Sequence, residues 1–337
     1  MTSHERKAIR KMNDLDALNA IIEGFNEYDS FSILTHVSPD GDTLGSGLAV
    51  YALLVGMGKR AEVICEEPVP HIYGYLPNAD KVVLPQDAQC FDCVIAVDCA
   101  DKQRFKKAEH IFENARHTMT IDHHFTNKGY AKVNLIRADA SATCEIVFDL
   151  YRALDKPVSG DAAICIYTGI VTDTGNLTYS NTTPRCIRMV ADMYENGLNI
   201  TEINRNIYRT IPYVKTRLQG YVLSNMKLEY DGRIGLATLS VGEMKDYGAS
   251  NEDCEGIVDN VRDVESVRVA VFIREGRDGT YKVSLRSKEC ADVGKIAGKY
   301  GGGGHAAAAG YTSKEPLSTT IANVIRDVKE ELAAYEN

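Results

Sequence analysis

Short apolar segments alternate with helical patterns through much of the first half of the chain. The apolar segments are rich in Val, Ile and Leu, as is typical of strands, and cover residues 31–34, 61–65, 91–97 and 118–121. The third is apolar almost without alternation, as expected of a strand buried on both faces. Helical patterns cover residues 14–25, 43–56, 111–115, 141–154 and 161–172. Strand, loop and helix in this order predict βαβ units, and hence an α/β domain with a doubly wound, mostly parallel sheet.

The pattern changes in the second half of the chain. A more polar helical region runs from residue 183 to about 217, and strand-like segments then return at 234–240, 267–273 and 281–286 with helices between them. This order predicts a smaller α+β domain. Two domains also suit a chain of 337 residues, which is longer than one hydrophobic core usually serves. The predicted boundaries are 1–195 for the first domain, 196–229 for a helical linker and 230–337 for the second domain.

Acidic and histidine side chains follow three of the predicted strands. After residues 31–34 come His36, Asp40 and Asp42, and a proline and a glycine in the same stretch place all three on a tight loop. The next candidate, Asp98, ends the strand at 91–97, and the run Asp122-His123-His124 ends the strand at 118–121. Because the carboxyl ends of parallel strands lie on one edge of a sheet, we expect these side chains to meet there.

A further carboxylate, Asp173, follows the helix predicted over 161–172. Its charge opposes the helix dipole, so a positive group should compensate it. Asp40, Asp42, Asp98 and Asp173 cannot all ionise in one pocket unless cations neutralise them. Oxygen ligands with few imidazoles and no thiolate favour manganese, magnesium or iron over structural zinc. We therefore expect two divalent cations, Mn²⁺ first and Mg²⁺ as the alternative, which together activate water for hydrolysis of a phosphoester.

Charge narrows the class of substrate. The chain has 38 basic and 47 acidic residues, a net charge of −9. Proteins that track long nucleic acids are usually basic, so this balance argues against such a role. It leaves small phosphorylated ligands open, because a local pocket rich in metal ions or cationic side chains can override the overall sign.

Cysteine usage and hydropathy bear on the compartment. The nine cysteines are scattered through apolar surroundings, which is typical of free, mostly buried thiols in a reducing compartment. The longest nearly uninterrupted apolar stretch, residues 48–58, is far shorter than the roughly 20 residues of a membrane-spanning helix. The charged first residues lack the apolar core of a secretory signal. These features predict a cytoplasmic protein without a membrane anchor.

A glycine-rich run at 301–310 contains one histidine, His305. Such a composition is usually a flexible linker. Here, however, the run lies inside the second domain, between two predicted helices. The backbones of Gly302, Gly303 and Gly304 can approach a ligand closely and donate their amides to an anion, so an anion-binding loop is the other interpretation. It is not a P-loop, because no Lys-Ser/Thr pair follows.

Taken together, these motifs make the chain similar to the DHH-superfamily phosphoesterases. The closest resemblance is to two-domain bacterial members that act as oligoribonuclease and as phosphatase of 3′-phosphoadenosine-5′-phosphate (pAp). The matching residues, in chain order, are His36, Asp40, Asp42, Asp98, Asp122-His123-His124, Asp173 and the segments 302–305 and 308–310. The resemblance covers nearly the whole chain and implies an active site in the cleft between the two domains.

The resemblance also implies roles for these residues. One metal ion would bind His36, Asp40 and Asp98, and the other Asp42, Asp98, His123 and Asp173, with Asp98 as the bridge. Asp122 would orient the histidines, and His124 would face the scissile phosphate. Gly302, Gly303, Gly304 and His305 would hold the substrate, with Arg286 as a phosphate-binding fork. Arg104 is a further candidate for a phosphate contact, although a solvated arginine at a helix start is its simpler interpretation.

Several functions share these motifs. The first is hydrolysis of short RNA oligomers to mononucleotides and of pAp to AMP. A second is cleavage of a cyclic or linear dinucleotide of the c-di-AMP or pApA type, and a third is a nucleotide-binding regulator without catalysis, which the complete ligand set disfavours. An inorganic pyrophosphatase would lack the glycine run, and RecJ-type exonucleases are normally longer. A homodimer is compatible with all of these.

Overall fold

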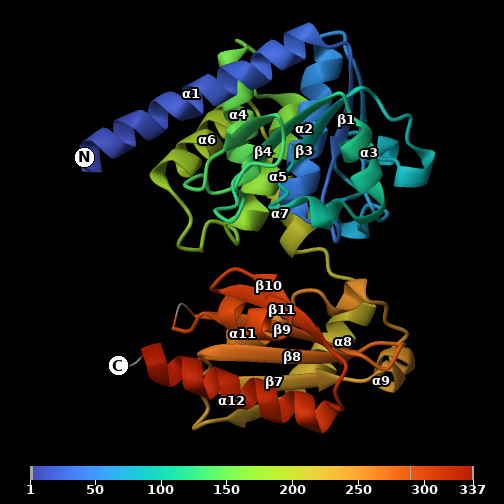
Figure 1. Ribbon diagram of the computed structural model, residues 1–337. Helices are drawn as coiled ribbons and strands as arrows, with labels where there is room; N and C mark the ends of the chain where they lie inside the picture. The colour runs from blue at the N-terminus through green and yellow to red at the C-terminus, as the bar shows by residue number, and fades with distance from the viewer. Residues whose placement is uncertain (1–2, 289, 336–337) are drawn as a thin grey trace. The chain divides into compact units, whose positions relative to one another are not determined.

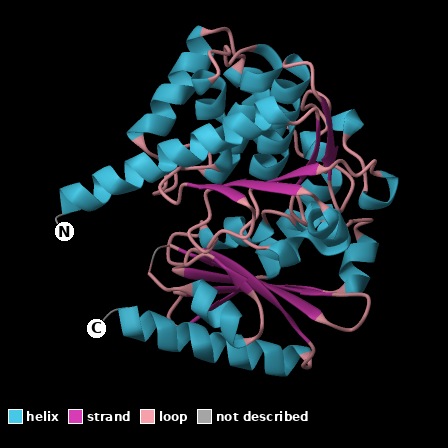
Figure 2. Cartoon of the chain, turned by 45° about the horizontal axis from the view of Figure 1, so that its top comes forward, coloured by secondary structure: helices cyan, strands magenta, loops and turns pink. Residues whose placement is uncertain are grey.

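The computed structural model describes residues 3–335 except residue 289, and the chain divides into two compact units, Met1–Thr210 and Ile211–Asn337 (Figure 1). Figure 2 shows the strands of each unit gathered in one layer with helices packed against it. Within the described residues, no helix is both long enough and apolar enough to cross a membrane.

The first unit is built on a sheet of five parallel strands in the order β2-β1-β3-β4-β5. The strands are β1 (Ser30–Leu34), β2 (Arg60–Ile64), β3 (Cys93–Val97), β4 (His117–Asp122) and β5 (Val133–Ile136). The first four lie where the apolar segments predict them. The short edge strand β5 was not predicted, because its four residues carry no clear alternation.

Helices cover both faces of this sheet. They are α1 (Ser3–Glu27), α2 (Gly41–Gly56), α3 (Glu109–Asn114), α4 (Thr143–Ala153), α5 (Gly160–Asp173), α6 (Pro184–Glu195) and α7 (Ile200–Tyr208), with 3₁₀ turns η1 (His71–Tyr73), η2 (Ala79–Lys81), η3 (Pro85–Asp87) and η4 (Lys102–Ala108). Ile33 and Ile95 pack into a large core with α1, α2, α4 and α5. Leu34 and Val94 point to the other face and pack against η4 and α3. The predicted doubly wound sheet is therefore confirmed.

The second unit contains a mixed sheet of six strands in the order β10-β11-β9-β8-β7-β6, in which only β7 and β8 run parallel. The strands are β6 (Lys227–Glu229), β7 (Ile234–Leu239), β8 (Val269–Glu275), β9 (Tyr281–Ser287), β10 (Gly303–Gly304) and β11 (Ala308–Ser313). The helices are α8 (Tyr213–Asn225), α9 (Val241–Asp246), α10 (Ile257–Arg262), α11 (Val293–Lys299) and α12 (Leu317–Tyr335), with the 3₁₀ turn η5 (Glu252–Cys254). Helices α11 and α12 cover one face, and α8 and α10 the other. The predicted α+β class is confirmed.

The polar helical region ahead of this sheet is shared between the units. Ile203 and Ile207 of α7 are buried in the core of the first unit, whereas Leu218 and Val222 of α8 are buried in the second.

The glycine-rich run belongs to the second sheet, so its interpretation as a flexible linker is wrong. Gly303 and Gly304 form β10 and pair antiparallel with β11. A Cβ atom on Gly302 would lie 2.2 Å from the carbonyl oxygen of Gly310, and one on Gly304 would lie 2.4 Å from that of Ala308. Glycine is therefore required at both positions because the β11 backbone approaches so closely.

The backbone of the same run is partly occupied. The amide of Gly302 donates to the carbonyl of Ala297, and the amide of His305 donates to the carbonyl of Ala308. The expectation that the amides of this run are available to an anion is wrong for these two, because the Gly302 amide caps the end of α11 and the His305 amide closes the hairpin.

Candidate metal centre

The carboxyl ends of β1, β3 and β4 lie side by side on one edge of the first sheet. The parallel register pairs Leu34 with Ala96 and Val97 with Ile121, so the residues that follow each strand emerge together. The expectation that His36, Asp98 and the run 122–124 share this edge is confirmed by the close approach of their side chains described below.

The stretch after β1 differs from the predicted loop. Asp40 is the N-cap of α2, and its carboxylate accepts hydrogen bonds from the amides of Asp42 and Thr43 at 3.1 and 3.0 Å. Asp42 consequently lies in the first helical turn, and the expectation that it is a loop residue is wrong. Gly41 is the first residue of α2. Glycine is required there, because a Cβ atom would lie within 3 Å of the Thr172 side chain. An aspartate N-cap before a tightly packed glycine explains why the helix begins so early.

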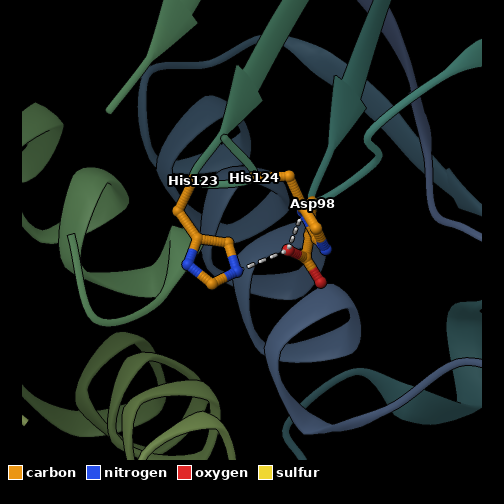
Figure 3. A group of neighbouring side chains, drawn as sticks. All are labelled: Asp98, His123 and His124. Carbon is orange, nitrogen blue, oxygen red and sulfur yellow. Dashed lines mark ion pairs between the residues drawn. The ribbon is translucent and has the colours of Figure 1, made fainter. Parts of the chain in front are cut away.

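Asp98 lies between two sets of candidate ligands. Its Oδ2 is 3.4 Å from Nε2 of His36. Its Oδ1 is 3.6 Å from both Nε2 of His123 and Nδ1 of His124, and Figure 3 shows the two histidines converging on this carboxylate. Asp98 also has a positive φ of 54°, a conformation that is uncommon outside glycine and often marks functional sites.

Asp42 is fully buried and is held by the start of another helix. Its Oδ2 accepts from the amide of Thr143 at 2.6 Å and its Oδ1 accepts from the amide of Cys144 at 2.9 Å. These amides begin α4, whose own N-cap residue, Ala142, has no side chain that can cap it. Asp42 therefore caps α4 from a distant part of the chain. Burial and the neighbouring charge of Asp98 raise the pKa of Asp42 to about 7.

Asp173 is the last residue of α5, as predicted. Its Oδ2 lies 3.2 Å from Nε2 of His123, which in turn is 3.9 Å from Oδ2 of Asp42. Burial, together with the charges of Asp42, Asp40 and Asp98, raises the pKa of Asp173 well above its ordinary value. Asp173 also lies at the C-terminal end of α5, the negative end of the helix dipole, and that end is close to His123.

His36 and His124 lie close to carboxylates that raise their pKa values. Burial lowers the pKa of His36, but the neighbouring carboxylates of Asp40 and Asp98 outweigh it and raise this pKa to about 10. Nε2 of His36 lies 3.7 Å from Oδ2 of Asp40. For His124, burial also lowers the pKa, and the hydrogen bond with Asp122 and the charge of Asp98 raise it overall.

Asp122, the first residue of the Asp-His-His run, is fully buried. Its Oδ1 lies 2.8 Å from Nδ1 of His124 and accepts from the amide of the same residue at 3.2 Å. Its Oδ2 accepts from Nδ2 of Asn127 at 2.7 Å. Burial raises the pKa of Asp122, but these hydrogen bonds outweigh burial and lower it. The geometry is that of a carboxylate that fixes the orientation of a histidine.

The cluster has the donor atoms of a metal site. Three sets of side chains each bring their ligand atoms within 4.8 Å of one another: His36, Asp40 and Asp98; Asp98, His123 and His124; and Asp42, His123 and Asp173. Burial and neighbouring carboxylate charges raise the pKa values of Asp42 and Asp173, so negative charge is costly at both positions. A bound cation would offset that cost. The arrangement can thus bind metal ions, and its oxygen-rich donors suit hard divalent cations.

The predicted substrate residues fall in both units. Arg104, on η4, joins the cluster of the first unit, where its Nη2 lies 3.1 Å from Nδ1 of His36. Arg286 lies on β9 of the second unit, where its Nε donates to Oδ1 of Asp259 at 3.1 Å and its Nη1 donates to its neighbour's carbonyl. Part of the proposed phosphate fork is thus already engaged. Gly302, Gly303, Gly304 and His305 lie in and beside β10 of the same unit.

Comparison with known proteins identifies the family. The model of the DHH family, N-terminal domain, matches residues 30–170, and that of the DHHA1 domain matches residues 234–335. A Thermus thermophilus protein named bifunctional oligoribonuclease and PAP phosphatase NrnA is 34% identical over 307 residues, which cover 89% of each chain. The chain belongs to the DHH family. A Bacillus subtilis DHH relative of the same name is 24% identical over 293 residues, covering 86% of this chain and 91% of that one.

A solved structure extends the likeness to the fold of the whole chain. An exopolyphosphatase-related protein from Bacteroides fragilis superposes with a TM-score of 0.90 at 26% identity, covering 96% of this DHH protein and 98% of its own chain. Both units of the fold therefore recur in a solved structure.

Three contributors to the site were missed by sequence reasoning. The amides of Thr143 and Cys144 hold Asp42, and Asn127 holds Asp122. No sequence signal marks a backbone amide as a partner of a distant carboxylate. The one available hint was Ala142, whose side chain cannot cap a helix, so the first amides of α4 need an outside acceptor.

Proposed function

We propose that this chain is a metal-dependent hydrolase of phosphoester bonds that cleaves short oligoribonucleotides to mononucleotides and converts pAp to AMP. Membership of the DHH family and the names of the relatives in Thermus thermophilus and Bacillus subtilis support the reaction class. The observation that carries the proposal is the position of Asp98, whose two oxygens face separate sets of ligands on either side.

The ligand sets divide naturally into two ion sites. His36, Asp40 and Oδ2 of Asp98 would hold one divalent cation. Asp42, His123, Asp173 and Oδ1 of Asp98 would hold the other. When bound, such a pair of ions supplies charge neutralisation and an activated water for in-line displacement at phosphorus. Mn²⁺ is our first expectation, with Mg²⁺ as the alternative, because carboxylates outnumber imidazoles in both sets.

The remaining residues of the cluster act on the substrate in this proposal. Asp122 fixes the ring of His124, and its hydrogen bond, together with the charge of Asp98, outweighs burial and raises the pKa of this ring. A cationic His124 would stabilise negative charge that develops on the phosphate. Arg104, beside His36, is placed to offer a second positive charge.

Residues of the second unit would bind the substrate. We assign this task to Arg286, Gly302, Gly303, Gly304 and His305, on the strength of the match to the DHHA1 domain. For Arg286, phosphate binding would compete with its contact to Asp259. The interdomain location of the active site, the cytoplasmic location and the homodimer stay predictions. All nine cysteines are free thiols and seven of them are buried, in line with a reducing compartment.

The decisive experiment removes the bridging carboxylate. Asn tolerates a positive φ about as well as Asp, so Asp98→Asn changes the ligand without straining the backbone. We expect this variant to stay folded, to lose bound Mn²⁺ and to hydrolyse pAp at least about a thousandfold more slowly, which corresponds to about 4 kcal/mol. Asp92→Asn, an exposed aspartate that precedes the same strand, is the matched control and should behave like the parent.

Substrate choice is tested on the parent protein. Turnover of pAp, a diribonucleotide, c-di-AMP and pApA should be compared at equal enzyme and Mn²⁺ concentrations. We expect the first two to be hydrolysed fastest. A preference for c-di-AMP or pApA would reassign the enzyme to the dinucleotide phosphodiesterases, and retention of substantial activity by Asp98→Asn would refute the two-ion assignment.

A further inference from the structure

Thr143 connects two of the carboxylates in the cluster. It is the first residue of α4 and is fully buried. Its hydroxyl donates to Oδ1 of Asp98 at 3.0 Å, and its amide donates to Oδ2 of Asp42 at 2.6 Å. A single residue that is not itself a candidate ligand therefore contacts both the carboxylate between the two ligand sets and one carboxylate of the second set.

The hydroxyl bond constrains how Asp98 presents its oxygens. A carboxylate oxygen has two lone pairs, and on Oδ1 one of them accepts the Thr143 proton. The histidines His36, His123 and His124 lie 3.4–3.6 Å from the same carboxylate, beyond a good hydrogen bond. Oδ1, which the Thr143 hydroxyl contacts, faces His123 and His124 (Figure 3), whereas Oδ2 faces His36.

The position of Thr143 makes this contact rigid. Thr143 opens a helix that Asp42 caps, so the backbone carrying the hydroxyl is itself anchored to the cluster. A β-branched side chain has few rotamers in a helix, which further limits the directions the hydroxyl can take. Asp98, by contrast, lies one residue beyond the end of β3 on a backbone of positive φ, and its backbone is held by the bond from its amide to the carbonyl of Ile121.

We propose that Thr143 is a positioning residue, whose hydroxyl holds the Asp98 carboxylate in the orientation that serves both ion sites. The inference rests on the proposed function, because it assigns Thr143 to the metal centre described there. The competing explanation is that the hydroxyl merely satisfies its own hydrogen-bonding need on burial.

Two substitutions separate these explanations. Thr143→Val removes the hydroxyl but keeps the shape, and Thr143→Ser keeps the hydroxyl but loses a methyl group. Both substitutions keep the backbone amide of residue 143, which donates to Asp42. Thr168→Val is the matched control, because Thr168 is equally buried and its hydroxyl donates to the carbonyl of Ile164 in its own helix.

The readouts are the Mn²⁺ affinity of metal-stripped protein, measured by titration calorimetry without substrate, the thermal unfolding temperature without metal, and kcat and KM for pAp. Loss of a residue that orients a ligand typically costs about 10- to 100-fold in metal affinity or activity. We expect Thr143→Val to weaken Mn²⁺ binding and lower kcat by that factor, with KM changed little. Thr143→Ser should restore both, and Thr168→Val should change only the unfolding temperature.

The outcomes discriminate between failure of this inference and failure of the proposed function. Parent-like Mn²⁺ affinity in Thr143→Val, or equal losses in Thr143→Ser and Thr143→Val, would overturn the role of Thr143 even in an active enzyme. If Thr143→Val does not fold, Thr143→Ala supplies a smaller hydroxyl-free variant for the same titration. If the parent binds Mn²⁺ but does not hydrolyse pAp, the proposed substrate fails, whereas the titration still decides the role of Thr143.

Discussion

Individual side chains around the metal centre are oriented by neighbours that are not ligands. Asn127 is buried, and its Nδ2 donates both to Oδ2 of Asp122 and to the carbonyl of Cys99, at 2.7 and 3.2 Å. It therefore ties the Asp-His-His run at the end of β4 to Cys99, which follows Asp98 just beyond the end of β3. A buried carboxylate such as Asp122 depends on this donor, because an unsatisfied polar group in the interior costs about 1–3 kcal/mol.

We predict that Asn127→Ala lowers kcat for pAp by about 10- to 100-fold, because Asp122 then no longer holds His124 in one orientation. Bound metal should change less than activity, since Asn127 contacts no candidate ligand. The check is metal content together with steady-state kinetics.

The control for this variant is Asn134→Ala. Asn134 makes its hydrogen bonds to the backbone of Ala131 and does not contact Asp122. Equal losses of activity in the two variants would show that Asn127 acts on general stability only.

The three glycines at 302–304, in the hairpin formed by β10 and β11, differ in the space available around them. Gly302 and Gly304 are required by the close approach of β11. Gly303 lies between them, and a Cβ atom there would meet nothing within 4 Å. Neighbouring glycines of identical appearance in the sequence therefore answer to different constraints.

We expect Gly302→Ala to destabilise the second unit by about 1–3 kcal/mol, because the new methyl group overlaps the backbone of Gly310. Gly303→Ala should leave stability nearly unchanged. Thermal and denaturant unfolding of both variants tests this. Gly303→Ala should, however, weaken pAp binding if the backbone at Gly303 approaches the substrate. Equal stability of the two variants would contradict the packing argument.

The charge of the entire chain bears on which RNA it degrades. Affinity for a long nucleic acid rises with each phosphate that a cationic surface neutralises. With a net charge of −9, this chain gains little affinity from phosphates beyond those that its local cationic groups contact. Short oligomers, whose phosphates can be contacted individually, are therefore favoured.

We predict that kcat/KM is highest for RNAs of about two to five nucleotides and declines for longer ones, with only a shallow dependence on salt. The test compares RNAs of increasing length with the same terminal sequence at two salt concentrations. Faster processing of long RNA, or a steep loss of affinity with salt, is the opposite result and would indicate an extended cationic track.

The sequence by itself determined the fold class and the candidate ligands. Continuous apolar segments such as residues 93–97 can be strands only when both faces are covered, which already implies a parallel sheet with helices on both sides. Once the sheet is parallel, its carboxyl edge collects Asp98 and the run 122–124 whatever the details of packing. These inferences need only local periodicity and the geometry of parallel strands.

The tertiary structure decided how those ligands are held. Asp42 is a helical residue because Asp40 caps α2, and the packing of α2 against α5 requires glycine at position 41 between them. The amide and hydroxyl of Thr143 reach carboxylates 101 and 45 residues away in the chain, and Asn127 reaches back to the end of β3. Hydrogen bonds to backbone atoms and contacts across such separations leave no periodic pattern, so only the folded chain reveals which residues contact the candidate ligands.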